Sequence, residues 1–158
     1  MKRRIPILLF IAMLLLPALT GCTTLQEQDV KVTQPITDNQ VVVVRKSEIE
    51  ALIRDRVNDG EYIGAELNRV VVNKDYGTTS SNKYIALVYF DLNKMSRKTG
   101  NSLMRMSSDD LVLTLAKKGV TDIRQVAIFW RDDYNNRNVK YAYEYRNGKA
   151  YITDVIGE

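Results

Sequence analysis

The first 21 residues restrict most strongly what the rest of this chain can fold into. A basic start at residues 2–4 precedes an apolar stretch from Ile5 to Leu19. A membrane-spanning helix needs about 20 apolar residues, so this stretch is short for a span but suits the apolar region of an export signal. We therefore expect residues 1–21 to be a signal peptide that is removed on export. The fold must then come from the remaining chain.

The four residues at the end of this leader read Leu19-Thr20-Gly21-Cys22. They resemble the lipobox of bacterial lipoproteins, in which an aliphatic residue, a small residue and Gly or Ala precede a cysteine. The resemblance covers only the first 22 residues. It implies that a dedicated peptidase cuts before Cys22 and that the thiol of Cys22 carries diacylglycerol. The alternative is an uncleaved anchor helix with a chance cysteine, and both place the domain outside the cytoplasm.

The residue after the lipidated cysteine indicates which membrane is used. In Gram-negative lipoproteins an Asp at that position commonly retains the protein at the inner membrane. Here the position is Thr23, so the resemblance implies the outer membrane, with the domain facing the periplasm. In a Gram-positive host the anchor would lie in the outer leaflet of the cell membrane. The expected partners are membrane lipid, through the acylated cysteine, and an envelope protein or cell-wall component.

The composition of the mature chain narrows its chemistry. Cys22 is the only cysteine, so the domain has no disulfide and must be held by its core. Removal of residues 1–21 takes away three basic side chains and no acid, which leaves 20 Lys and Arg against 19 Asp and Glu. A nearly neutral exported domain lacks the positive charge that supports nucleic-acid binding. Residues 22–39 are polar and aperiodic, so we predict a lipid-anchored flexible tether there, with one domain at residues 40–158.

Local patterns predict the first elements of that domain. The β-branched run Val41–Val44 favours a buried strand. Ser47 and Glu50 have the spacing of a capping box, which predicts a helix that ends near Gly60. After a short strand at Val70–Val72, we predict a mobile loop over residues 73–82.

Two longer strands and a second helix follow. Tyr84–Leu92 alternates apolar residues on both faces, which is typical of an inner strand. Ser107 or Ser108 can cap a helix that runs to Gly119 and buries Leu111, Val112, Leu115 and Ala116. Ile123–Arg131 is the next strand, and residues 132–138 form a polar loop.

The C-terminal hairpin has the firmest local signal. Asn147-Gly148 predicts a type I′ turn between strands Val139–Arg146 and Lys149–Ile156. A two-residue turn fixes the register, so we expect the pairs Tyr145–Ala150, Tyr143–Ile152 and Tyr141–Asp154. We also expect residues 150–156 to lie at the edge of the sheet.

The predicted element order is β-α-β-β-α-β-β-β. Two helices after the first and third strands would cover one face of a mostly antiparallel sheet of about five or six strands. We therefore predict a two-layer α+β domain. Ferredoxin-like and cystatin-like or NTF2-like arrangements remain open.

The sequence excludes several kinds of catalysis. It contains no histidine, which removes histidine triads, bases and metal ligands. The lipidated thiol leaves no catalytic cysteine, and no glycine-rich phosphate loop is present. Carboxylate-dependent hydrolysis stays open because Asp109-Asp110 and Asp132-Asp133 are adjacent acids. Asp133, Asn135 and Glu144 have part of a calcium-loop spacing, but Arg137 replaces a ligand and Asn138 replaces the turn glycine, so we expect no metal and no other cofactor.

An aromatic cluster is the remaining candidate site. Tyr141, Tyr143 and Tyr145 share one face of a predicted strand, near Trp130 and Tyr134. Exposed, they would form a partner-binding surface; buried, they would be cross-strand packing beneath the helices. We expect a non-catalytic domain that binds another envelope component or assists assembly. The alternatives are a small-ligand-binding domain and the carboxylate hydrolase.

Overall fold

Two helices and five strands make up the part of the chain that the computed structural model describes, which is residues 38–60, 62–77 and 83–158. The helices are α1 (Asp38–Asp59) and α2 (Arg97–Lys117). The strands are β1 (Ala65–Lys74), β2 (Tyr84–Leu92), β3 (Ile123–Asp132), β4 (Arg137–Arg146) and β5 (Lys149–Ile156). The predicted signal peptide, Cys22 and nearly all of the predicted tether lie outside the described residues.

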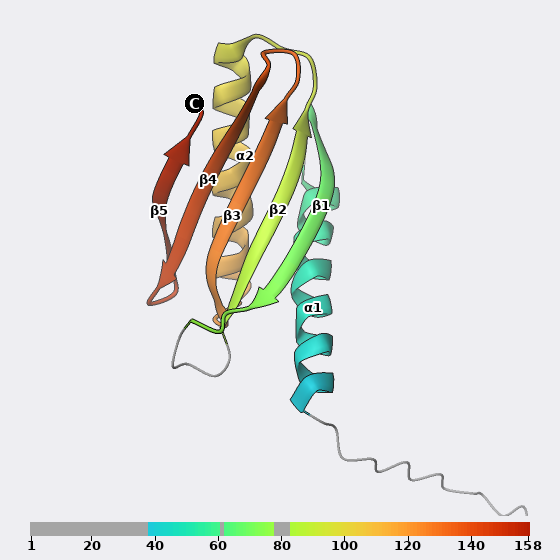
Figure 1. Cartoon of the computed structure of the whole chain (residues 1–158), viewed down its shortest axis with the longest axis vertical. Coiled ribbons are helices and arrows are strands. Elements are labelled where there is room, and N and C mark those ends of the chain that lie inside the picture. The colour runs from blue at the N-terminus through green and yellow to red at the C-terminus, as the bar shows by residue number, and fades with distance from the viewer. Residues whose placement is uncertain (1–37, 61, 78–82) are drawn as a thin grey trace, which may run out of the picture. The chain divides into compact units, whose positions relative to one another are not determined.

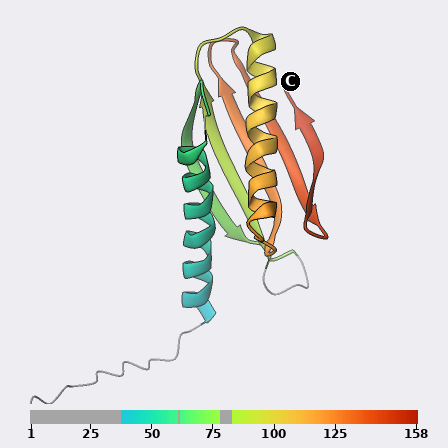
Figure 2. The same ribbon diagram turned by 180° about the vertical axis from the view of Figure 1, so that it is seen from behind.

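The five strands form one sheet whose order, β1-β2-β3-β4-β5, follows the chain. Strands β2 and β3 are parallel because α2 connects them, and all other neighbours are antiparallel. Both helices lie behind the sheet in Figure 1 and in front of it in Figure 2, so they cover the same face. This confirms the predicted two-layer α+β class with a mostly antiparallel sheet.

The core fills the space between the helices and that face. In β2 every second residue is buried, from Tyr84 to Leu92, because side chains alternate along a strand. Ile49 and Ile53 of α1 and Leu111 of α2 reach the same cluster and are fully buried. The opposite face, which we call the open face, is covered by neither α1 nor α2 (Figures 1 and 2).

The predicted strand at Val41–Val44 is wrong, because these residues belong to α1. The helix starts at Asp38, and Val42 packs against the core from the same helix as Ile49 and Ile53. In residues 38–60, 62–77 and 83–158 this segment pairs with no strand, and its packing as a helix overrides the β propensity of valine. Ser47 is therefore not an N-cap; its hydroxyl donates to the carbonyl of Val43, 3.2 Å away inside the helix.

The predicted start of the second helix is also wrong. Helix α2 begins at Arg97, and its N-cap is Ser96, 11 residues before Ser107, the earlier of the two predicted caps. The Ser96 hydroxyl accepts a hydrogen bond from the Thr99 amide. Ser108 lies in the middle of the helix and is buried. The first turns of α2 are rich in polar residues because one side of the helix faces solvent, so the sequence pattern did not indicate a helix there. The observed order is α-β-β-α-β-β-β, which also excludes the ferredoxin-like order, since no helix separates the first two strands.

The C-terminal hairpin was predicted more closely. Asn147 and Gly148 both have positive φ, 53° and 72°, as the type I′ turn requires. The pairs Tyr145–Ala150 and Tyr143–Ile152 are confirmed, but Tyr141 faces Val155 and not Asp154. The register shifts between Ala142 and Tyr143, where a β-bulge gives β5 one extra residue. The position of β5 at the edge of the sheet is confirmed.

Candidate binding surface on the open face of the sheet

The cross-strand register arranges the open face in rows that run across all five strands. One row, which we call the aromatic row, contains Arg69, Tyr89, Phe129, Lys140 and Ile156. The row beside it is small and apolar and contains Val71, Leu87, Ala127, Ala142 and, at the edge, Asp154. The side chains in the inner strands of both rows are half-buried. An apolar surface therefore crosses the sheet on the open face, opposite α1 and α2.

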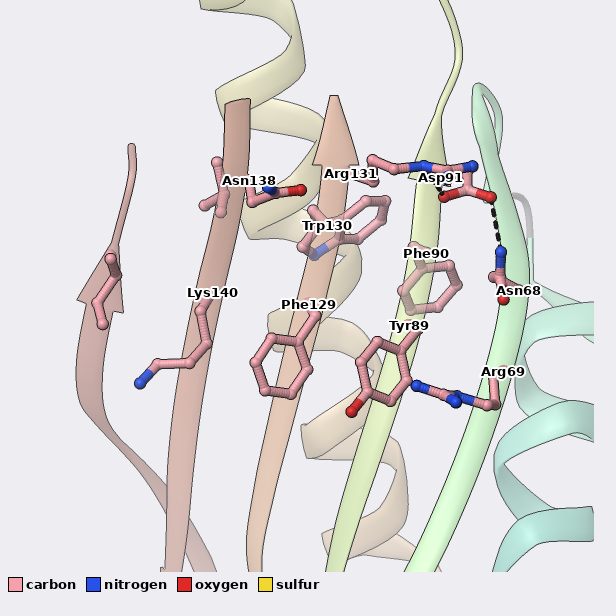
Figure 3. Close-up of a pocket in the computed structure, with 12 residues that line it drawn as sticks. Asn68, Arg69, Tyr89, Phe90, Asp91, Phe129, Trp130, Arg131, Asn138 and Lys140 are labelled. Carbon is pink, nitrogen blue, oxygen red and sulfur yellow. Dashed lines mark hydrogen bonds and ion pairs between the residues drawn. The ribbon is translucent and has the colours of Figure 1, made fainter. Parts of the chain in front are cut away.

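Three side chains of the aromatic row, those of Arg69, Tyr89 and Phe129, lie next to one another (Figure 3). The ring centroids of Tyr89 and Phe129 are 4.9 Å apart and the rings are nearly parallel, at 12°. Neighbouring strands are spaced by about 4.8 Å, so the rings stand on the sheet side by side. The Arg69 guanidinium lies 4.3 Å from the centroid of the Tyr89 ring, in a cation–π contact that fixes this end of the row.

Charged and amide groups border the row on one side. Arg131 pairs with Asp91 at 2.9 Å, and Asn68 donates to the other oxygen of Asp91 at 2.9 Å (Figure 3). In the row itself, Lys140 pairs with Asp154 at 2.6 Å. Most charges of the surface are therefore already matched within the chain.

The aromatic row and its polar border line a shallow hollow of about 390 Å³. Aromatic and aliphatic atoms form most of its wall, and a few polar groups stand at its rim (Figure 3). This combination is typical of binding sites, in which apolar surface supplies affinity and convergent polar groups supply orientation. No histidine or cysteine is among the residues that line the hollow.

The predicted aromatic surface is corrected by the structure. Trp130, Tyr141 and Tyr143 are 1%, 0% and 4% exposed and belong to the core beneath the helices. Tyr145 is half-buried against that core, and only Tyr134, in the turn after β3, is well exposed. The five residues do not form one surface, because the strand face that carries them is the face the helices cover.

The polar atoms of these buried aromatics have partners. The Trp130 indole donates to Ser108 at 2.9 Å, and the Tyr143 hydroxyl donates to Asp109 at 2.7 Å. The Tyr145 hydroxyl donates to the Val112 carbonyl at 2.7 Å. Burial, assisted by the bond to Asp109, raises the pKa of Tyr143 well above its ordinary value. These hydroxyls remain protonated donors and bind the sheet to α2.

The two adjacent acid pairs are each divided between different partners. Asp109 pairs with Arg105 at 3.1 Å, whereas Asp110 pairs with Arg56 at 2.7 Å and accepts from Tyr62 at 2.8 Å. The structure therefore does not bring these carboxylates together in one cleft.

The second pair is divided by burial. Asp132 is fully buried and pairs with Arg137 at 2.8 Å, while the side chain of Asp133 is 78% exposed. Burial works to raise the pKa of Asp132, but hydrogen bonds from Arg137 and Asn135 outweigh it and hold the pKa below its usual value. Asp132 is an ionised structural group of the β3–β4 turn.

The partial calcium-loop spacing has no counterpart in space. Asn135 bonds to Asp132, and Glu144 lies in β4, where it pairs with Arg146 at 2.5 Å. In residues 38–60, 62–77 and 83–158, no cluster of three or more Asp, Glu, Cys or His could hold a metal ion.

Sequence reasoning missed the aromatic row as a site. The alternation in β2 already placed Tyr89 on the side opposite Phe90, and the same period separates Phe129 from Trp130. The signal was therefore present as two aromatic pairs, one in each inner strand. What could not be read was which member of each pair faces the helices.

No helix in the described part of the chain is long and apolar enough to cross a membrane. The lipobox residues Leu19, Thr20, Gly21 and Cys22 lie outside the described residues. The chain matches no protein-family model, no curated protein and no solved structure.

Proposed function

We propose that this chain is a lipid-anchored protein of the bacterial envelope and that its domain is a non-catalytic module that binds another envelope component. The observation that carries the proposal is the aromatic row on the open face. The ligand would contact Tyr89 and Phe129 and exchange hydrogen bonds with the polar border at Asp91 and Arg131.

The open face carries more apolar side chains than a solvated sheet face usually does. An antiparallel sheet with one solvated face usually carries polar side chains there. Here the inner strands place Ile85, Leu87, Tyr89 and Phe129 on that face. A contiguous apolar patch with a polar rim marks an interaction site on a soluble domain, and aromatic rings supply large contact area at small entropy cost.

The anchoring half of the proposal rests on the lipobox behind its basic and apolar leader. Changing Cys22 to Ser should abolish incorporation of labelled palmitate and leave the precursor uncut by the lipoprotein peptidase. Unchanged labelling in this variant would refute the anchor and leave the binding surface to be judged separately.

The binding half can be tested by photo-crosslinking in intact cells. A photoreactive phenylalanine analogue replaces Phe129 in the full chain, and the matched control carries it at Tyr76, which is 85% exposed and lies in the turn after β1. We expect a defined adduct from position 129 and none from position 76. Equal labelling from both positions, or none from either, would refute the proposal.

The mass of the adduct separates two forms of the function. A large adduct indicates a protein or cell-wall component, which is the proposed ligand. An increase of a few hundred daltons would indicate the small-ligand alternative, which the hollow of about 390 Å³ favours.

A further inference from the structure

The two edges of the sheet differ in what they offer a partner. Edge strand β1 carries Glu66, Asn68 and Arg69 and has a bulge between Leu67 and Arg69. Charges and bulges are the usual protection of an edge against pairing with another chain. Edge strand β5 exposes mainly apolar side chains, namely Tyr151 (48%), Ile152 (38%), Val155 (37%) and Ile156 (54%).

Helix α2 extends this apolar edge. Leu113 is 51% exposed and lines a groove of about 240 Å³ with Ala150 and Ile152 of β5. Met106 is 71% exposed and lies seven residues earlier, on the same side of the helix. Strand and helix together present an apolar border along one side of the domain.

The bulge gives β5 a face pattern that is symmetric about the peptide between Thr153 and Asp154. On one side of this point, Ile152 pairs with a residue of the covered face and Tyr151 with a residue of the open face. On the other side, Val155 pairs with the covered face and Ile156 with the open face. Thr153 is the extra residue of the bulge, and without it the two halves would be out of phase.

We propose that the β5 edge pairs with the β5 edge of a second copy of this chain, antiparallel and centred on the Thr153–Asp154 peptide. In this register Ile152 faces Val155 of the second copy on the covered side, and Tyr151 faces its Ile156 on the open side. Both are apolar pairs of the kind that stabilise antiparallel strands.

The neighbouring registers are less favourable. A shift by one residue would place Ile152 opposite Asp154 and would turn covered-face side chains toward open-face ones. The second copy is thus a partner whose faces and apolar pairs agree in one arrangement.

The pairing has a consequence for binding. Because the faces match, both open faces lie on the same side of the joined sheet, and both aromatic rows stay free. A ligand with repeated contact sites would then engage two rows at once, which strengthens attachment without any new contact.

A disulfide experiment tests the register. Directly opposed residues in antiparallel strands have Cα atoms about 4.5–5.5 Å apart, within the range of a disulfide, whereas residues three positions out of register lie about 10 Å apart. The full chains Ile152→Cys and Val155→Cys are purified in detergent, mixed and oxidised mildly. In the mixture, we expect disulfide-linked dimers to approach half of all chains, which is the share that random pairing places in mixed dimers. Each variant alone should form no more disulfide-linked dimer than the wild type. The wild type measures any dimer that is linked through Cys22.

A second measurement guards against an effect of the cysteines. Ile152→Lys should halve the protein mass measured by light scattering while the chain still unfolds cooperatively, at a melting temperature lowered only by the loss of the second copy. Its matched control is Ile63→Lys, which alters an exposed residue (74%) in the turn before β1 and should keep the dimer mass. A monomeric wild-type chain, or a dimer that survives Ile152→Lys and gives no mixed disulfide, would overturn the proposal. The proposal would also be overturned if the purified chain were monomeric and β5 paired instead with a strand of a different protein.

Discussion

The two faces of the sheet are built from the same strands and have different roles. On the covered face, Trp130 and Phe90 stack at 4.5 Å beneath α1 and α2 and are about 1% exposed. On the open face, the ring centroids of Phe129 and Tyr89 lie 4.9 Å apart, and both side chains are only half-buried. Each ring of one pair is the chain neighbour of a ring of the other. Similar aromatic pairs thus serve as core on one side and as accessible surface on the other.

The difference between the faces also extends to charge. The covered side buries a complete ion pair between Asp132 and Arg137, with side chains 0% and 9% exposed. The open side holds the pair of Asp91 and Arg131, of which Arg131 is 56% exposed. If the open face is a binding surface, substitutions there should cost binding, while matched substitutions on the covered face should cost stability.

The largest expected effect comes from the two neighbouring aromatics of β3. Trp130→Ala should lower the free energy of unfolding by about 3–5 kcal/mol, because it leaves a cavity and removes the partner of Ser108. Phe129→Ala should lower it by less than about 1 kcal/mol, the size of a cross-strand contact. Urea unfolding of both variants checks this. Equal losses would mean that the open face is a second core and not a ligand surface.

Removal of a buried and of an exposed ion pair should change the free energy of unfolding by clearly different amounts. Asp132→Ala leaves Arg137 buried without its partner and should cost about 3 kcal/mol. Asp91→Ala removes an exposed pair and should cost about 0–1 kcal/mol.

The same pair predicts a dependence on pH. The pKa of Asp132 is lower in the folded chain than in the unfolded chain, where it is about 3.9. Its contribution is therefore complete above the unfolded pKa and is lost as the pH falls through the folded pKa. Urea midpoints measured from pH 7 down to pH 3 should fall more steeply for the wild type than for Asp132→Ala. Parallel curves would contradict this assignment.

Removal of two tyrosine hydroxyls, one on each side of this comparison, should change stability by smaller amounts. Tyr143→Phe removes a 2.7 Å bond to Asp109 beneath α2 and should cost about 1 kcal/mol. Tyr151→Phe alters an exposed side chain of β5 and should change stability by less than about 0.5 kcal/mol. Thermal unfolding measures both, and the comparison fails if Tyr151→Phe is the more damaging change.

The last prediction concerns the cation of the aromatic row, where a small effect on stability is expected. Arg69→Met keeps the apolar stem but removes the charge above Tyr89, at a cost of about 0.5 kcal/mol. Photo-crosslinking from position 129 should nevertheless weaken, because the ligand surface is altered. A stability loss above about 1 kcal/mol with unchanged crosslinking would show that the row serves the fold alone.

Sequence patterns were sufficient wherever a signal is local. The alternation of Tyr84–Leu92 identified an inner strand with its correct bounds, since the two-residue period depends only on backbone geometry. Asn147-Gly148 identified the last turn because few residues accept positive φ. The α+β class followed from these elements and from the apolar stripe around Leu111.

Local signals failed wherever packing decided the outcome. The run Val41–Val44 has strand propensity, yet it is helical because Val42 continues the stripe of Ile49 and Ile53 toward the core. The predicted partner of Tyr141 was wrong because a bulge adds Thr153 to β5. No residue type in this segment predicts that bulge. The start of α2 was hidden by polar residues that face solvent.

The sequence by itself determined which side chains share a face, because alternation along a strand is a property of the backbone. It separated Tyr89 and Phe129 from Phe90 and Trp130 without any knowledge of the fold. Only the tertiary structure decided which set became core. That choice depends on the side of the sheet to which α1 and α2 pack, and contacts between distant segments set it. The candidate site therefore consists of half-buried aromatics on the sheet face opposite α1 and α2, and a one-dimensional pattern cannot express that placement.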